Sequence, residues 1–333
     1  MPFLRQAVDS ILRQSFADFE LLILDDASTD GTAEFLHGLR DARVRLIFLE
    51  QNIGLTAALN RGLREAKGEF VARQDADDVS HPDRLARQVA FLRANPKCAL
   101  VGSQAHLVDG AGRSLGRKNL PLEHGSICFA HIFDNAFAHS SVVFRRAAVE
   151  AVGGYDEMWR ASQDYELWSR LSVAHELANL PERLVTLRVL ESSITRTVAQ
   201  STLIRRVQTE HYRRHFGGEV READLDLIAL VRSRIVPERL REFRGLLEDL
   251  VEIYAGAHPG ITERHDFRRT LALLHERIGY NLLTLARGAA WGELRRAWQT
   301  WPPSVLGMPW LRILALTCLG DGARNLYAKL GRR

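Results

Sequence analysis

The stretch FVARQDADD, from Phe70 to Asp78, joins a short apolar run to three carboxylates. Phe70–Ala72 has the aromatic and β-branched character of a strand, and Asp75, Asp77 and Asp78 follow it closely. In open α/β sheets, ligand-binding residues gather beyond the carboxyl ends of strands. Carboxylates this close together repel one another unless a cation or hydrogen-bond donors compensate their charge. The stretch therefore predicts an α/β sheet with a charged site at one edge.

A carboxylate cluster of this kind suits a hard divalent cation. Mg²⁺ and Mn²⁺ take oxygen ligands and commonly bridge to substrate phosphates. The alternative interpretation is structural, because Asp and Ser also favour turns and helix caps. Since a DxD pattern occurs often by chance, the context of Asp75 and Asp77 has to decide between the two.

The residues around this stretch continue the α/β pattern. Through the first 200 residues, short apolar runs alternate with helical patterns, as in an open α/β sheet. A second acidic pair, Asp25-Asp26, also follows a predicted strand, and Ser80 with Pro82 predicts the start of a helix. Strands are expected at 19–24, 44–49, 70–72, 99–108, 141–144 and 183–190, and helices at 4–12, 54–66 and 164–173.

The sequence changes character after about residue 200. The strand signal ends there, and helical patterns follow, separated by pairs such as Gly217-Gly218 and Pro302-Pro303. The first part is mildly acidic and the second basic. We therefore expect an α/β domain at 1–200 and an all-helical extension at 201–333.

The end of the extension combines aromatic and basic residues. Trp291, Leu294, Trp298 and Trp301 share helical spacing among several arginines. Tryptophan and basic residues favour the headgroup region of bilayers, so peripheral membrane contact is expected through residues 287–333. The alternative is a helical cap that buries these aromatics against protein. No nucleic-acid recognition motif is found, so no nucleic-acid partner is expected.

The composition is that of an ordinary globular protein, with 46% hydrophobic and 26% charged residues. Cys98, Cys128 and Cys318 lie far apart, which predicts reduced thiols and neither a disulfide framework nor a zinc site. No leader pattern follows Met1, and the apolar stretch 305–320 is too short and interrupted to predict a membrane span. These features predict a cytoplasmic protein, or one held peripherally at the inner face of the cell membrane.

A series of further motifs accompanies the acidic stretch in a fixed order. The motifs are Asp25–Thr32 (DDASTDGT), Asn52–Gly54 (NIG), Asp75–Asp78 (DADD), Gly153–Asp156 (GGYD) and Gln163–Trp168 (QDYELW). Together they resemble the family 2 glycosyltransferases of GT-A fold, over roughly residues 2 to 197. The resemblance implies a nucleotide-diphospho-sugar transferase with a Rossmann-like mixed sheet.

The resemblance also implies a role for each matching residue. Asp164 would be the catalytic base and Asp77 the ligand of Mn²⁺ or Mg²⁺. Asp25, Asp26, Asn52 and Asp75 would bind the donor nucleotide, and His139 and Gln163 would lie on the acceptor side. For Asp164 the structural alternative is a helix start, where the helix dipole stabilises a carboxylate. For His139 the alternative is an ordinary structural histidine.

Two features depart from the family pattern. Relatives carry a strand and a nucleotide-contacting loop before the helix that here begins near Leu4, so we expect an incomplete amino terminus with exposed strand edges. Relatives also often carry a metal-ligating histidine where Leu190 stands, and leucine cannot ligate a metal. Gln163, often glutamate in relatives, is a milder change because it leaves Asp164 in place.

The resemblance implies an inverting, metal-dependent transferase. It would move a sugar from a nucleotide-diphosphate donor, expected to be a UDP-sugar, to a hydroxyl of a glycan or lipid-linked acceptor in polysaccharide or glycoconjugate biosynthesis. An inactive, glycosyltransferase-like binding protein is the first alternative, favoured by the two departures. A sugar nucleotidyltransferase is the second, although the glycine-rich phosphate loop of such enzymes is not found.

Overall fold

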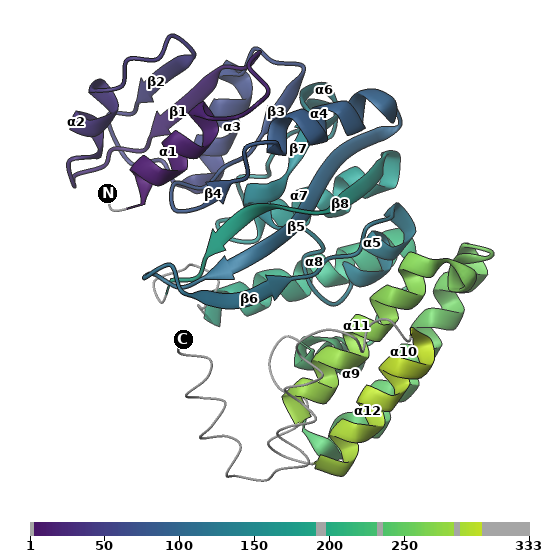
Figure 1. The fold of residues 1–333 in the computed structure, drawn as a ribbon. Helices are drawn as coiled ribbons and strands as arrows, with labels where there is room; N and C mark the ends of the chain where they lie inside the picture. Colours follow the sequence, from purple (N-terminus) through teal and green to yellow (C-terminus); the bar gives the residue numbers. More distant parts are fainter. Residues whose placement is uncertain (1–2, 191–197, 232–235, 283–286, 302–333) are drawn as a thin grey trace. The chain divides into compact units, whose positions relative to one another are not determined.

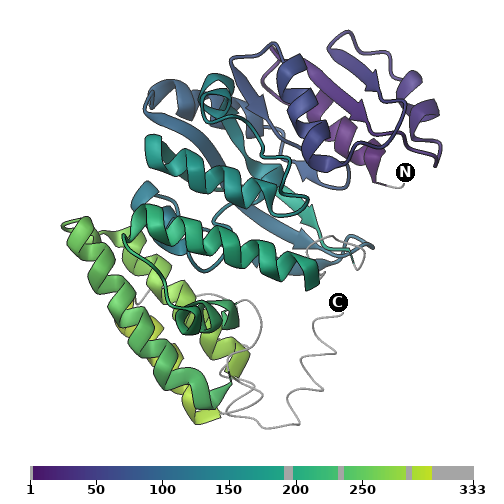
Figure 2. The same cartoon turned by 180° about the vertical axis from the view of Figure 1, so that it is seen from behind.

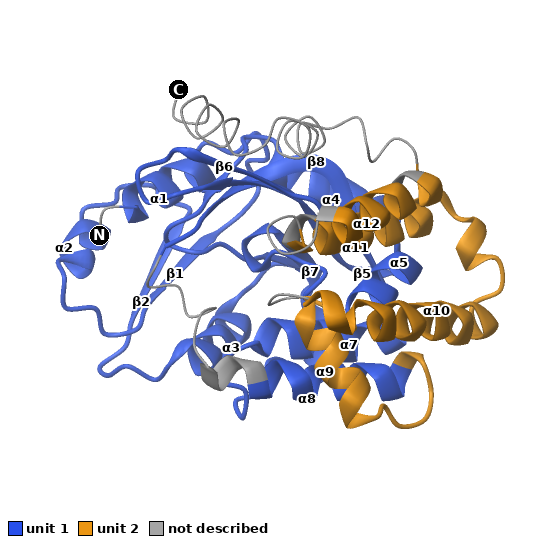
Figure 3. Cartoon of the chain, turned by 90° about the horizontal axis from the view of Figure 1, so that it is seen from below, with its two compact units in different colours: residues 1–131, 135–214 blue, residues 132–134, 215–333 orange. Residues whose placement is uncertain are grey.

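The structure is a computed structural model of the 333-residue chain that describes residues 3–190, 198–231, 236–282 and 287–301. The chain divides into two compact units. Unit 1 comprises residues 1–131 and 135–214, and unit 2 comprises residues 132–134 and 215–333 (Figure 3).

Unit 1 begins with a small α/β layer. The chain runs through α1 (Leu4–Leu12), β1 (Leu21–Asp25), α2 (Thr32–His37), β2 (Val44–Phe48) and α3 (Leu55–Glu65). β1 and β2 form a parallel two-stranded sheet in which Leu21 lies opposite Val44 (Figure 1). Because its apolar residues recur at helical spacing, α1 buries Ala7, Val8 and Ile11 on one face.

A second, six-stranded sheet forms the centre of unit 1. Its strands are β3 (Phe70–Ala72), β4 (Val79–Ser80), β5 (Cys98–Val108), β6 (Ser114–Lys118), β7 (Val143–Arg145) and β8 (Glu176–Arg188). The order is β3-β7-β5-β8-β4, with β6 paired to β5. β5 and β8 are parallel, whereas β3, β4, β6 and β7 pair antiparallel to their neighbours. The predicted mixed sheet is confirmed.

Helices cover both faces of this sheet (Figures 1 and 2). Successive side chains of a strand point to opposite faces, and the two faces have separate cores. Leu100 of β5 packs in a cluster with Trp168 of α7 (Gln163–Ala174), whereas Val101 packs in another with Leu92 of α4 (Arg84–Ala94). The remaining helices of the unit are α5 (His124–Ala130), α6 (Arg146–Ala151), the 3₁₀ turn His139–Ser141 and α8 (Val198–His215).

Two predicted boundaries near the acidic loop are wrong. Ser80 lies in β4, where it pairs with Val185, and does not cap a helix; α4 begins at Arg84 after Asp83. Ser141 belongs to the 3₁₀ turn before β7 because its N–H bonds back to the carbonyl of Ala138 at 2.8 Å. Both errors fall beside the acidic loop, where the chain turns between short strands.

Unit 2 is helical in its described part, as the sequence predicts. It contains α9 (Glu222–Leu230), α10 (Leu240–Ala257), α11 (His265–Leu282) and α12 (Arg287–Thr300), with 3₁₀ turns at Pro237–Arg239 and Ile261–Glu263. Unit 1 extends past the expected boundary at residue 200, because α8 through Arg214 belongs to it.

The tryptophan-rich segment is described only as far as residue 301. Leu294 is fully buried, and the Trp301 indole N–H donates to His265 Nε2 at 2.9 Å, within unit 2. Residues 302–333 of the expected membrane-contacting stretch lie outside the described residues. In the described part of the chain, every helix falls short of the length and apolar character that crossing a bilayer requires.

Candidate active site

The three carboxylates of the acidic loop converge. Asp75, Asp77 and Asp78 lie between β3 and β4, and each offers an oxygen within 4.8 Å of the others. The carboxylate of Asp77 makes no hydrogen bond or ion pair with another described residue. By contrast, Asp78 accepts a hydrogen bond from the backbone N–H of Arg188, N···O 2.7 Å. Asp77 is therefore the member most available to a ligand.

Asp75 is held in place by a buried arginine. The Arg73 side chain is 8% exposed and forms an ion pair with the Asp75 carboxylate. Ser140 Oγ donates to Asp75 Oδ2 at 2.7 Å and accepts from the Asp75 backbone N–H at 3.1 Å. Burial alone would raise the pKa of Asp75, but the Arg73 guanidinium outweighs it and lowers that pKa. Asp75 is therefore a fixed anion.

The other two carboxyls lack such compensation. Burial, followed by repulsion from Asp75, raises the pKa of Asp77. Burial raises the pKa of Asp78 to about 6, against the opposing hydrogen bonds from Ser140 and the Arg188 backbone. Raised carboxyl pKa values mark negative charge without a full counter-charge, which a divalent cation would supply.

Asp164 lies in the first turn of α7, where backbone N–H groups and the helix dipole favour an anion. Asn135 Nδ2 donates to Asp164 Oδ2 at 2.7 Å and so fixes the orientation of the carboxylate. The preceding residue but one, Ser162, has φ of 59°, a left-handed conformation that non-glycine residues seldom adopt. This sharp turn directs the chain into α7 just before Asp164.

Three groups, Arg73, His139 and Tyr155, connect Asp164 with the acidic loop. The carboxylates of Asp164 and Asp75 both act on the pKa of His139 and of Tyr155, and both lie close enough to interact with the Arg73 guanidinium. His139 Nε2 lies 3.1 Å from the Tyr155 hydroxyl. The predicted base and the predicted diphosphate-facing aspartate are thus brought into one charged neighbourhood.

His139 predicts a pH dependence of stability. Burial, and then the Arg73 guanidinium, lower the pKa of His139 from 6.5 to about 4, against the carboxylates of Asp164 and Asp75. Because the unfolded chain takes up this proton near pH 6.5 and the folded chain only near pH 4, the contribution is complete above pH 6.5 and is lost as the pH falls. In urea unfolding, wild type should lose about 2 kcal/mol more than His139→Gln between pH 7 and pH 5. Equal losses would contradict this assignment.

A second group forms around the acidic pair after β1. Asp26 accepts hydrogen bonds from the backbone N–H of Ile53 at 2.8 Å and of Gly54 at 3.0 Å. Asn52 Nδ2 donates to the Asp26 carbonyl at 3.2 Å. Asp25 is 6% exposed, and its Oδ1 accepts from the backbone N–H of Ser28 at 3.1 Å. The sequence motifs DDAS and NIG are therefore packed together as one polar loop cluster.

The structure brings together the predicted residues in these two groups, and no hydrogen bond or ion pair among the described residues joins one group to the other. Gln163 is 5% exposed at the start of α7, beside Asp164. Leu190 follows β8 and lies beside Gly110. Arg73, Asn135, Ser140 and Tyr155 were not assigned from the sequence. Arg73 adjoins the acidic stretch and could have been found, whereas Asn135 has no motif around it.

The fold has solved relatives. S. aureus TarS, residues 1–349, matches with a TM-score of 0.54 in its complex with UDP-GlcNAc, at 15% identity, over 91% of this chain and 88% of that one. Its complex with UDP matches with a TM-score of 0.53 at 16% identity, over 90% and 85%. At such identities the likeness is one of fold, and it defines the class as GT-A.

Sequence relatives identify the family. The model for "Glycosyl transferase family 2" matches residues 1–152. AmsE of Erwinia amylovora, an amylovoran biosynthesis glycosyltransferase, is 31% identical over 188 residues, which cover 56% of this chain and 70% of AmsE. EpsE of Bacillus subtilis, a putative glycosyltransferase, is 36% identical over 174 residues, 50% of this chain and 61% of EpsE. The chain belongs to glycosyltransferase family 2, and its match spans less than two thirds of EpsE.

Proposed function

We propose that this chain transfers a sugar, with inversion, from a UDP-sugar to a hydroxyl of a glycan or lipid-linked acceptor. The observation that carries the proposal is the placement of Asp164 and the acidic loop around the same Arg73, His139 and Tyr155. A base and a diphosphate-binding cluster are the two parts that a single inverting displacement requires. Family membership supports this assignment.

The acidic loop fits a divalent cation. Its donor set is all oxygen, and Asp77 has no competing partner among the described residues, as Mn²⁺ or Mg²⁺ binding requires. A bound cation would neutralise charge on the departing diphosphate. Asp77 would hold the ion, while Asp75 would face the diphosphate from its ion pair with Arg73.

The remaining residues supply binding and proton transfer. The Asp164 carboxylate accepts the proton of the acceptor hydroxyl. At the same time, the oxygen of that hydroxyl bonds to the anomeric carbon, and the bond from this carbon to the diphosphate breaks. Asn135 holds that carboxylate in orientation. Asp25, Asp26 and Asn52 would bind base and ribose, and His139 and Gln163 would line the acceptor side.

The names of relatives support the substrate class. TarS has been solved with UDP-GlcNAc, and AmsE and WbnJ of Escherichia coli are named for amylovoran and O-antigen biosynthesis. We extend a UDP-sugar donor and a role in surface polysaccharide assembly to this chain. In the proposal, the α/β part catalyses transfer on the cytoplasmic side of the membrane, and the helical extension makes the peripheral membrane contact.

A binding protein without turnover is the second candidate. Leu190 favours it, because this residue stands where relatives often supply a metal ligand and its side chain cannot coordinate a cation. In this case the chain would still bind a nucleotide through Asp26 and Asn52.

The test is transfer with and without metal. We expect labelled sugar to move from a UDP-sugar to membrane-extracted glycolipid acceptors in Mn²⁺, and EDTA to abolish transfer until Mn²⁺ is restored. The physical reason is the uncompensated charge at Asp77 and Asp78. Transfer that is insensitive to EDTA would refute the metal assignment, and UDP binding without turnover on any donor would favour the binding protein.

A further inference from the structure

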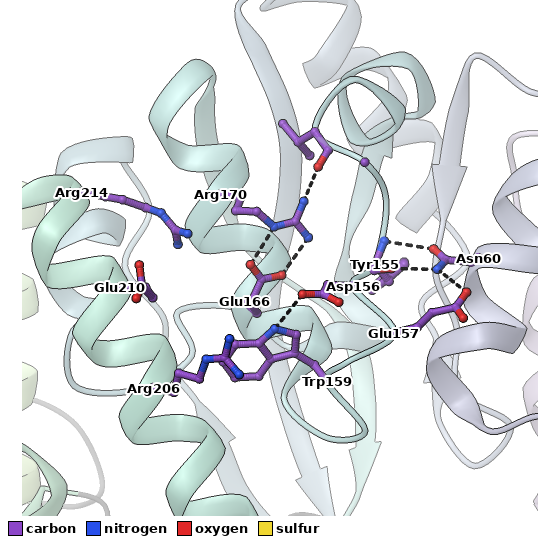
Figure 4. Close-up of a pocket in the computed structure, with 12 residues that line it drawn as sticks. Asn60, Tyr155, Asp156, Glu157, Trp159, Glu166, Arg170, Arg206, Glu210 and Arg214 are labelled. Carbon is purple, nitrogen blue, oxygen red and sulfur yellow. Dashed lines mark hydrogen bonds and ion pairs between the residues drawn. The ribbon is translucent and has the colours of Figure 1, made fainter.

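A charged cavity of about 780 Å³ in unit 1 is lined in part by Tyr155, which also contacts His139 of the candidate active site (Figure 4). Its walls come from α3, the segment Val152–Ser162 between α6 and α7, α7 itself and α8. A cavity of this size is commonly a ligand site. Here, however, most of its polar groups bond to one another and to the backbone of the Val152–Ser162 segment.

Arg170 of α7 is the centre of these contacts. Its Nε and one terminal nitrogen each donate to a different carboxylate oxygen of Glu166, both at 2.7 Å. The same guanidinium also donates to the carbonyls of Val152 and, at 2.8 Å, of Gly154. A bidentate pair fixes the plane of the guanidinium. The Glu166–Arg170 pair can therefore hold the start of the segment through two backbone carbonyls.

Asn60 of α3 holds the segment from the other side. Its amide bonds to both backbone groups of Tyr155: Nδ2 donates to the carbonyl at 2.7 Å, and Oδ1 accepts from the N–H at 3.0 Å. Gly153 and Gly154 adopt φ of 91° and 69°, which a side chain would strain. A Cβ on Gly154 would also lie 3.0 Å from Asn60 Oδ1. The glycines allow the amide of Asn60 to approach the turn.

The held segment enters the candidate active site at both ends. Tyr155 is 3% exposed and its hydroxyl meets His139. At the other end, Ser162 leads into Asp164 through its left-handed turn. A displacement of the Tyr155 backbone would therefore move the groups around the proposed base, Asp164.

We propose that Arg170 and Asn60 are positioning residues, which hold the Val152–Ser162 segment so that Tyr155 and Asp164 face the acceptor. The inference rests on the proposed function. It assigns the cavity to the support of the site, since its carboxylates and amide are engaged by the protein. In the described part of the chain, no hydrogen bond or ion pair joins the clamp formed by Arg170 and Asn60 to Asp26 or Asn52, so donor binding and turnover should respond differently.

The first test is kinetic. Arg170→Lys keeps the charge but loses the planar fork, and Asn60→Ala removes both bonds to Tyr155. Each is expected to lower kcat about 100-fold, the typical cost of misplacing a reacting group by about 1 Å, while the Kd for UDP stays within about twofold. The fold-loss of kcat in the double variant should be smaller than the product of the two single fold-losses, because both residues act through one segment. Loss of UDP binding in parallel with kcat would overturn the proposal.

The matched control is Arg206→Gln. Arg206 lines the same cavity from α8, lies over the Trp159 ring at 5.0 Å and makes no ion pair with a described residue. This variant should keep wild-type kcat and acceptor KM. An increase in acceptor KM would show instead that the cavity binds substrate.

The second test does not depend on turnover. In hydrogen exchange, Asn60→Ala should accelerate the Tyr155 amide, whose N–H is held by Asn60, and Arg170→Lys should accelerate exchange in 152–162. Residues 44–48 of β2 should be unchanged in both. Unchanged exchange in the segment would overturn the clamp even if wild type is active. A wild type without transfer but with this exchange pattern would refute only the proposed function.

Discussion

Asp164→Asn is expected to lower kcat by about 10²–10⁴-fold, the range in which a positioned general base contributes. The substitution keeps the size of the side chain and its ability to accept the 2.7 Å hydrogen bond from Asn135. An amide cannot take the proton of the attacking hydroxyl. The loss should therefore appear in kcat, with acceptor KM and UDP affinity close to wild type.

A loss of kcat without a change in acceptor KM or UDP affinity distinguishes a catalytic role of Asp164 from a structural one. Asp164 lies in the first turn of α7, so its removal also costs a helix-dipole interaction of about 0.3–1 kcal/mol. Thermal unfolding should register that cost in Asp164→Asn as a small decrease in Tm. Asn135→Ala supplies a graded comparison, because it leaves the carboxylate but frees its orientation, and kcat should fall less. Wild-type kcat in Asp164→Asn would assign the residue to the helix start alone.

The sequence predicts the regular parts of unit 1 well because their patterns are local. The first eight residues of β5 are buried on both faces, as the apolar run Cys98–Val101 at its start indicates, and α1 shows its buried face through helical spacing. β8 is predicted only from residue 183, although it begins at Glu176. The reason is Pro181, which lacks an N–H: the register with β5 moves from Ser103–Leu180 to Gln104–Arg183 around it.

The candidate site is predicted in its acidic members but not in their partners. Asp75, Asp77 and Asp164 lie in motifs that signal their chemistry. Ser140 and Asn135 reach these carboxylates from parts of the chain 65 and 29 residues away. Such contacts depend on how the 3₁₀ turn and α7 pack on the sheet, and a single sequence carries no pattern that fixes this packing.

The contacts of the clamp were likewise not predicted from the sequence. Gly154 stands in the GGYD motif and Asn60 in the helix predicted at 54–66, yet neither side chain has reactive chemistry. Their role becomes visible when the 95-residue separation between Asn60 and Tyr155 is closed by two backbone hydrogen bonds. Motifs of this kind report geometry around a site rather than chemistry within it.

Asp77→Asn is expected to abolish the effect of Mn²⁺ on UDP binding and to lower kcat/KM by about 10²–10³-fold. The loss corresponds to about 3–4 kcal/mol, within the several kcal/mol that a metal ion contributes to stabilising charge in a transition state. Asp77 is the appropriate target because its carboxylate has no described partner, whereas Asp75 is tied to Arg73 and Asp78 to the Arg188 backbone. Removing Asp77 should therefore leave the loop intact.

Calorimetric titration with UDP, with and without Mn²⁺, measures this directly. Wild type should bind UDP more tightly when Mn²⁺ is present, and Asp77→Asn should bind it with one weaker affinity under both conditions. Asp18→Asn is the control, because Asp18 is an exposed aspartate without a hydrogen bond or ion pair to another described residue, and its replacement removes the same charge. If the binding of UDP still depends on Mn²⁺ in Asp77→Asn, the metal ligands would be reassigned to Asp75 and Asp78. Because Leu190 cannot contribute a ligand, Asp77 would carry a larger share of the metal affinity in the proposed site, so the difference between Asp77→Asn and Asp18→Asn should be large.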